Sequence, residues 1–179
     1  AHLLQGPRAP VGLRQGVNLA TRGRAAPIWV AAALAATTAI AGALVTDLGP
    51  WYQSLRQPAW KPPDWAFGPI WTLIFSLTAL AGVTAWRAER DRRYRAGLLG
   101  MFVLNGVLNG LWSAFFFHLR PPDWALVEAV LLWLSILLLI LALGRVSRRA
   151  ALLLLPYLAW VSLATALTWS VVQMNGPFG

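Results

Sequence analysis

Four residues between positions 105 and 116 combine amide groups with aromatic rings. They are Asn105, Asn109, Trp112 and Phe116. In a helix Asn109 lies about 40° from Asn105, and Trp112 and Phe116 each lie about 20° from it, so all four share one stripe. Amides donate and accept hydrogen bonds, and aromatic rings stack on flat apolar molecules. The chemistry indicated is non-covalent binding, although hydrogen bonds between helices explain the asparagines equally well.

Other kinds of chemistry have little support. The chain has no cysteine, which excludes disulfides, thiolate metal sites and cysteine nucleophiles. Its histidines, His2 and His118, lie in the N-terminal tail and at the end of the third predicted helix, so neither is placed to bind haem iron. Glu128 lies about 6 Å along its helix from Trp124, and we expect an interfacial carboxylate there, not a proton relay. We expect no metal, no cofactor and no acid–base catalytic group.

Five apolar segments must position these side chains. They span residues 28–46, 65–86, 96–117, 124–143 and 150–172. Each is about 28 to 35 Å long as a helix, which matches a hydrocarbon core of about 30 Å. Hydrophobic residues make up 58% of the chain and charged residues 12%, and the segments lack the polar stripes of soluble helices. The sequence predicts an all-α membrane protein, a bundle of five transmembrane helices over residues 28–175.

Basic residues indicate how the bundle is oriented. Of the 15 lysines and arginines, 12 lie in the N-terminal tail, the second loop and the fourth loop. The positive-inside rule therefore predicts that the N-terminus lies inside and the C-terminus outside, in what we expect to be a bacterial membrane. As topology anchors these arginines give no reason to expect nucleic-acid binding. Residues 1–27 are typical of a basic tail or a transit-like extension, and we favour a disordered tail.

The first loop, residues 47–64, contains four prolines, two tryptophans and a tyrosine. This composition indicates an ordered cover over the bundle and not a flexible tether. Trp51, Tyr52 and Trp60 could contribute to a ligand site or anchor the loop at the membrane interface. The sequence alone does not choose between these roles.

A hexapeptide occurs twice, as KPPDWA at residues 61–66 and RPPDWA at residues 120–125. Prolines followed by an acid are typical of helix starts, where Asp64 or Asp123 would accept hydrogen bonds from free N–H groups. The repeat therefore predicts two helix entries on the same outer face. Pro69 follows the first copy and suggests that regular helix begins only there.

Small residues indicate where helices approach closely. Gly106 and Gly110 form a GxxxG pattern, which could serve contacts within the chain or between two copies. Trp71, Trp112 and Trp160 are expected between the midplane and the outer end of the bundle, beneath the first loop. An aromatic cavity with a few amides and a lid is typical of a site for an apolar ligand that carries one or two polar groups.

Three stretches together resemble the TspO/MBR family of tryptophan-rich sensory proteins and translocator proteins. They are WYQSLRQPAWKPPDWAFGPIW (residues 51–71), LNGVLNGLWSAFFF (104–117) and PYLAWVSLATALTW (156–169). The resemblance covers about residues 28–175. It implies a five-helix bundle, often dimeric, that binds porphyrins, sterol-like molecules and benzodiazepine-type ligands under the first loop. The sterol consensus of animal members is absent, because the fifth segment has no tyrosine followed by lysine or arginine.

The resemblance also implies site residues. The matching positions are Trp51, Tyr52, Trp71, Asn105, Asn109 and Trp160, and the candidate site is completed by Trp60, Phe75, Trp112, Phe116 and Ala164. Some bacterial members are reported to degrade protoporphyrin in light, with tryptophans at the positions of Trp71 and Trp160 implicated.

The function expected from these observations is a membrane binding protein, a sensor or carrier for porphyrins and similar apolar ligands. A metal-free porphyrin would insert between Trp71 and Trp160 and direct its propionates toward Arg56, Lys61 or the amides of the first loop. The alternative is an enzyme that degrades protoporphyrin by light-dependent oxidation, which no acid, base or metal constellation supports. Membrane lipid and a second copy of the chain are the other expected partners.

Overall fold

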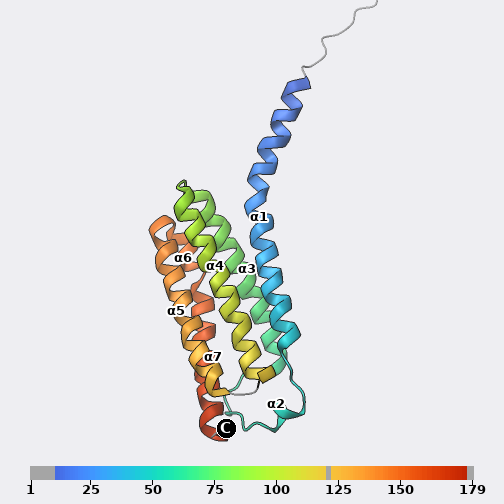
Figure 1. The fold of residues 1–179 in the computed structure, drawn as a ribbon, viewed down its shortest axis with the longest axis vertical. Helices are drawn as coiled ribbons and strands as arrows, with labels where there is room; N and C mark the ends of the chain where they lie inside the picture. The colour runs from blue at the N-terminus through green and yellow to red at the C-terminus, as the bar shows by residue number, and fades with distance from the viewer. Residues whose placement is uncertain (1–10, 120–121, 177–179) are drawn as a thin grey trace, which may run out of the picture.

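The computed structural model describes residues 11–119 and 122–176, and these residues form a bundle of long helices (Figure 1). The elements in order are α1 (Val11–Val45), α2 (Pro50–Ser54), α3 (Asp64–Ala88), α4 (Arg92–Ser113), the π-helical η1 (Ala114–Leu119), α5 (Pro122–Val146), α6 (Arg148–Leu152) and α7 (Leu155–Asn175). The predicted fold class is confirmed.

Five stretches of helix are long and apolar enough to cross a membrane, as the sequence predicted. They are Ala26–Val45, Asp64–Ala88, Arg92–Leu119, Asp123–Val146 and Arg148–Asn175. The last stretch is interrupted where α6 ends at Leu152 and α7 begins at Leu155. Pro156 explains the interruption, because it has no N–H to bond to the preceding turn.

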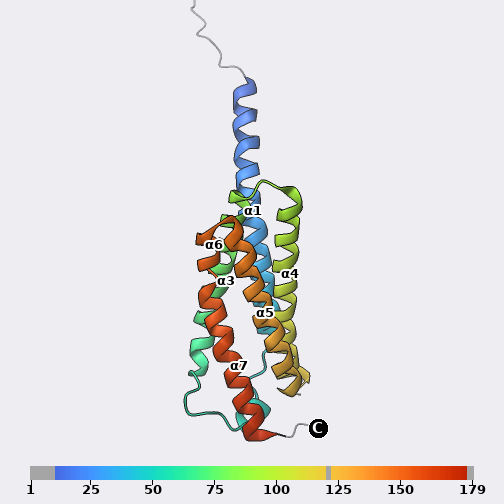
Figure 2. The same ribbon diagram turned by 90° about the vertical axis from the view of Figure 1, so that its left-hand side faces the viewer.

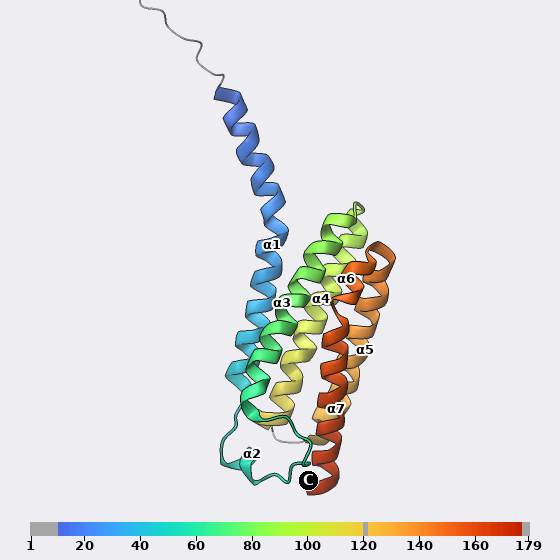
Figure 3. The ribbon, with the colours of Figure 1, turned by 180° about the vertical axis from the view of Figure 1, so that it is seen from behind.

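The five spans form a closed ring. Helix α1 packs on α3 and α4, α5 packs on α4, α6 and α7, and α3 contacts α6 and α7. Figures 2 and 3 show this arrangement from the side and from behind. Loop helix α2 and the end of α7 lie at one end of the bundle, and the α3–α4 and α5–α6 connections lie at the other (Figure 1). The arginine-rich loops therefore share the end opposite the first loop.

Helix α1 begins at Val11 and runs through Pro27. The expectation of a disordered tail is therefore wrong for residues 11–27, while residues 1–10 lie outside the described residues. Leu, Ala, Arg and Gln in this stretch favour helix, and extending an existing helix avoids the cost of nucleation. None of the most apolar stretch of α1 is buried, against 39% of that of α5. Helix α1 is thus the least buried of the five spans.

The start of α3 differs from the prediction. The helix begins at Asp64 and includes Pro69, and its N-cap is Pro63, which makes no side-chain cap. Pro69 costs one backbone hydrogen bond to the carbonyl of Trp65, but its φ angle suits a helix. The carboxylate of Asp64 does not cap α3 because it is engaged by the first loop.

Candidate functional site

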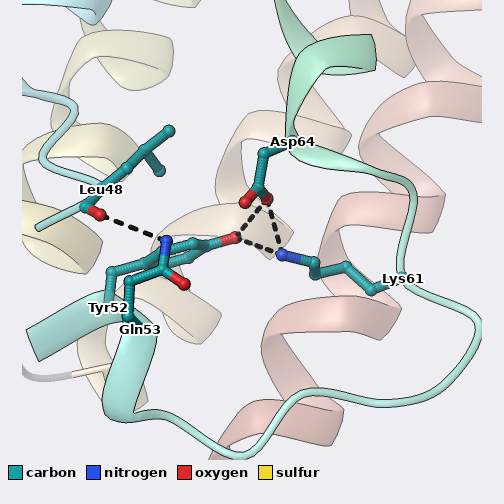
Figure 4. Close-up of polar contacts among 5 residues, drawn as sticks. All are labelled: Leu48, Tyr52, Gln53, Lys61 and Asp64. Carbon is teal, nitrogen blue, oxygen red and sulfur yellow. Dashed lines mark hydrogen bonds and ion pairs between the residues drawn. The ribbon is translucent and has the colours of Figure 1, made fainter. Parts of the chain in front are cut away.

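Three side chains fasten the first loop to the start of α3 (Figure 4). Lys61 Nζ lies 2.6 Å from Asp64 Oδ1 and donates a hydrogen bond to the Tyr52 hydroxyl at 3.1 Å. The Tyr52 hydroxyl also donates to Asp64 Oδ1 at 3.3 Å. Gln53 Nε2 donates to the carbonyl of Leu48 and steadies α2 from the other side. We call Tyr52, Lys61 and Asp64 the loop clasp.

The environment of the loop clasp keeps Tyr52 neutral and Lys61 charged. Burial raises the pKa of the Tyr52 hydroxyl, and the hydrogen bond from Lys61 offsets this in part. Partial burial lowers the pKa of Lys61, but its hydrogen bonds to Asp64 and Tyr52 outweigh that effect, so the net shift is upward. A neutral hydroxyl and an ammonium group are the forms that the observed hydrogen bonds require.

A second attachment ties the loop to the end of α7. The side chain of Asn175 accepts a hydrogen bond from the Arg56 backbone N–H at 2.7 Å and donates one to the Arg56 carbonyl at 2.9 Å. The first loop is therefore attached to both α3 and α7, as expected for an ordered cover. The side chain of Arg56 itself is exposed, and Trp60 is 49% exposed in the same loop.

Aromatic rings pack directly beneath α2. Trp51 meets Phe116 edge to face at 6.2 Å between ring centroids, and Trp112 stacks on Phe116 at 5.5 Å. Tyr52 contacts Phe117 at 5.7 Å. The sequence stripe predicted Trp112 and Phe116 on one face but missed Phe117. In the π-helical η1 each turn takes an extra residue, so Phe116 and Phe117 are both buried.

A second aromatic group joins α3 to α7. Trp71 stacks on Phe75 at 5.2 Å and meets Trp160 edge to face at 6.4 Å. Phe67 contacts the other side of Trp160 at 5.4 Å. The two tryptophans that the sequence paired across the site therefore lie in the same cluster.

Little space remains among these rings. The cavity bounded by Trp71, Trp112, Val161, Ala164 and their neighbours has a volume of about 10 Å³. The sequence predicted an aromatic cavity at this place, and the rings predicted to line it pack on one another here. A ligand can enter only by displacing them.

The two asparagines bind other helices. Asn105 Nδ2 donates to Ser135 Oγ on α5 at 2.8 Å. The Tyr157 hydroxyl on α7 donates to Asn105 Oδ1 and accepts from Asn109 Nδ2, each at 3.2 Å. This confirms the helix-to-helix role that the sequence left open. Tyr157 was missed, although it lies three residues before Trp160 and hence on the same face of the helix.

Several buried polar atoms next to the aromatic cluster lack a hydrogen-bond partner among the described residues. They include the indole nitrogens of Trp112 and Trp160 and both carboxylate oxygens of Glu128. Glu128 is only 4% exposed, so its carboxylate faces the interior of the bundle, while its position near the membrane interface stays a prediction. Its helix, α5, is the most buried of the five spans, and one turn past Trp124 its inward positions already face the bundle. Unpaired indole N–H groups could donate to a ligand's oxygen or nitrogen atoms.

Comparisons with known proteins agree with this architecture. The sequence model of the TspO/MBR family matches residues 29–174. The tryptophan-rich protein TspO of Chlorobaculum tepidum is 44% identical over 129 residues, which is 70% of this chain and 79% of that protein. The human translocator protein is 34% identical over 126 residues, 70% of this chain and 75% of that protein. Protein CrtK of Rhodobacter capsulatus is 31% identical over 147 residues, 82% and 89% of the two chains.

Proposed function

This chain belongs to the TspO/MBR family of integral membrane proteins, and from that premise we propose that it binds porphyrins or similar flat apolar ligands beneath its first loop. The ligand would stack on Trp71 and Trp160 after the rings move apart. The observation that carries the proposal is the meeting of these two indoles, 6.4 Å apart, under a loop pinned to both α3 and α7.

The polar part of the ligand is also constrained. The unpaired N–H groups of Trp112 and Trp160 suit a ligand whose apolar body carries a few acceptors, such as carboxylates or carbonyls. Lys61 is held by Asp64, so it reaches a propionate only when the loop clasp opens. Arg56 is exposed and free of that constraint. We therefore favour Arg56 over Lys61 as the partner of a propionate.

Closure of the site supports a sensor or carrier that changes conformation on binding. The rings leave only about 10 Å³ among them, so a bound macrocycle requires their rotation and displacement of the loop. Such a ligand shifts the population toward an open form by its differential affinity for that form. Ligand binding would thereby change the conformation of the first loop, which lies at the surface of the protein.

The second candidate is a light-dependent enzyme. In this reaction a photoexcited porphyrin reacts with dioxygen, and the indoles exchange electrons with the porphyrin. The edge-to-face contact between Trp71 and Trp160 favours it, because one ring could pass an electron to the other. The candidate adds chemistry to the same site and needs the same binding step.

A titration in darkness tests the binding proposal. Purified protein in detergent is titrated with protoporphyrin while the quenching of tryptophan fluorescence is followed, and the sample is then illuminated and scanned for a new absorbing product. Saturable quenching at one porphyrin per chain supports binding, and a linear response without saturation would contradict it. A new pigment that forms only with protein, light and dioxygen would favour the enzyme.

A further inference from the structure

A cavity of the described structure lies away from the first loop. It has a volume of about 280 Å³ and lies between α1, α3 and α4. Its walls include Val30, Leu34, Ala35, Ala79, Leu99 and Phe102. These side chains are apolar, so the space is suited to hydrocarbon and not to water.

The cavity extends along the helices that line it. Its lining on α1 runs from Ala26 to Thr38, about 18 Å along the helix, and on α3 from Phe75 to Trp86, about 17 Å. Its deep end is formed by Asn105 and Tyr157, near the middle of the bundle. One leaflet contributes about half of a hydrocarbon core of about 30 Å. The cavity therefore extends over about one leaflet, at the arginine-rich end.

The deep end includes a close contact between helices. Thr38 Oγ1 on α1 lies at Gly106 on α4, only 3.0 Å from where a β-carbon would stand. The hydroxyl of Thr38 is already bonded to the carbonyl of Leu34, and Asn105 is bonded to Ser135 and Tyr157. Thr38 and Asn105 therefore need no ligand, which leaves the Thr78 hydroxyl as the unpartnered buried polar atom in this part of the described lining.

A positive charge lies beside the opposite end of the cavity. Trp86 lines the cavity there, and the guanidinium of Arg95 lies over its ring, 5.1 Å from the centroid. Within residues 11–119 and 122–176 no carboxylate pairs with Arg95, and its buried Nε has no hydrogen-bond partner. A guanidinium beside an apolar channel is matched by an anionic group attached to a hydrocarbon chain.

We propose that this cavity binds one acyl chain of an anionic membrane phospholipid, whose phosphate is held by Arg95. A space of about 280 Å³ spread over this length is narrow, which suits a single chain better than a flat macrocycle. Since no residue of the most apolar stretch of α1 is buried, the chain would enter from the bilayer beside this helix. The lipid would add to the contacts that already hold α1 to α3 and α4.

Native mass spectrometry of the protein released from nanodiscs tests the proposal. The nanodiscs contain equal amounts of phosphatidylglycerol and phosphatidylcholine with identical chains. Wild-type protein should retain one phosphatidylglycerol in preference to phosphatidylcholine. Arg95→Gln should reduce that preference about tenfold, the loss expected for one charge-assisted contact. Equal retention of the two lipids by the wild type would overturn the proposal.

Variants within the cavity test whether an acyl chain occupies it, separately from the binding of the headgroup by Arg95. Ala35→Phe fills the channel and should abolish retention of both lipids, while Thr78→Val removes a buried hydroxyl that has no partner and should preserve retention. If Thr78→Val releases the lipid, the occupant is polar at depth and the proposal is wrong. Should Ala35→Phe fail to fold, as circular dichroism would reveal, Ala31→Leu fills the same wall by a smaller amount with the same expected loss.

Free fatty acid is the other source of a chain with an anionic head. Oleate added in excess to the lipid-bound protein should leave the phosphatidylglycerol in place, and displacement by oleate would refute a phospholipid as the occupant. Porphyrin titration of Ala35→Phe should match the wild type, because Ala35 lies on α1 and makes no ring contact in the aromatic cluster, although Phe75 and Tyr157 border both sites. Failure of one proposal is thus distinguishable from failure of the other.

Discussion

The Tyr157 hydroxyl on α7 donates a 3.2 Å hydrogen bond to the side-chain carbonyl of Asn105 on α4, at the boundary between the two halves of the bundle. On one side Tyr157 meets the ring of Trp71, 6.1 Å away, in the aromatic cluster. On the other side both residues line the end of the apolar cavity. The hydrogen-bonded pair therefore lies between the proposed porphyrin site and the proposed lipid site and borders both.

Replacing Tyr157 with phenylalanine should destabilise the bundle. The substitution leaves Asn105 Oδ1 and Asn109 Nδ2 without the hydroxyl they bond to in a buried layer, and we expect a loss of about 1–3 kcal/mol in the free energy of unfolding. Unfolding in detergent, followed by circular dichroism, measures it. Ser76→Ala is the control, because that exposed hydroxyl bonds only to its own helix. Equal stability of the two variants would show that the layer contributes nothing.

Breaking the ion pair of the loop clasp should open the first loop. Asp64→Asn weakens the bond to Lys61, and trypsin cleavage after the exposed Arg56 should accelerate about two- to fivefold, as expected for a partly exposed pair. The matched control is Asp123→Asn, since Asp123 holds the same place in the second hexapeptide and is exposed. Equal acceleration in the control would argue against a specific role for the clasp.

The loop clasp should also be sensitive to alkaline pH. The pKa of Lys61 is raised from 10.5 and that of Tyr52 from 10.0, so the folded state holds both protons more tightly than the unfolded state does. The stability from the clasp is fully present below the unfolded pKa values and is lost as the pH rises through the folded ones. The difference in thermal midpoint between wild type and Lys61→Met should stay constant from pH 7 to about 9.5 and shrink at higher pH. A difference that shrinks below pH 9 would contradict this account.

The two glycines of the GxxxG pattern should differ in their tolerance of alanine. A β-carbon at Gly106 would lie 3.0 Å from Thr38 Oγ1, whereas one at Gly110 would meet nothing within 4 Å. Gly110→Ala should stabilise α4 by up to about 1 kcal/mol through helix propensity. Gly106→Ala should lose that gain by pushing α1 away, so its thermal midpoint should be lower than that of Gly110→Ala. Dissociation of a dimer in Gly110→Ala alone would locate the expected contact between copies there.

The sequence predicted the elements of this structure better than their detailed contacts. Hydropathy and length defined the five spans because a membrane helix must satisfy its backbone internally and present apolar side chains. Depth along the helices also brought Trp71 and Trp160 together correctly, since a fixed rise per residue determines depth. Both predictions depend on local geometry alone.

The errors arose where distant segments compete for one side chain. Asp64 was predicted as a helix cap because its neighbours suggest one, but Lys61 and Tyr52 engage its carboxylate. Phe117 escaped notice because the π-turn changes the helical period only after Ser113. The cavity between α1, α3 and α4 was not predicted, because it depends on how these three helices pack together. No local sequence pattern determines that packing.

The affinity for protoporphyrin of the Trp71→Phe, Trp160→Phe double variant tests the central claim most directly. Binding should be followed by the absorbance of the bound porphyrin, so that losing tryptophans does not change the signal. The matched control is Trp169→Phe, a tryptophan on the same helix α7 that is 55% exposed. We predict a Kd at least about tenfold higher for the double variant, as expected from two weakened aromatic contacts, and an unchanged Kd for the control. An equal Kd for all three proteins would contradict a site formed by Trp71 and Trp160.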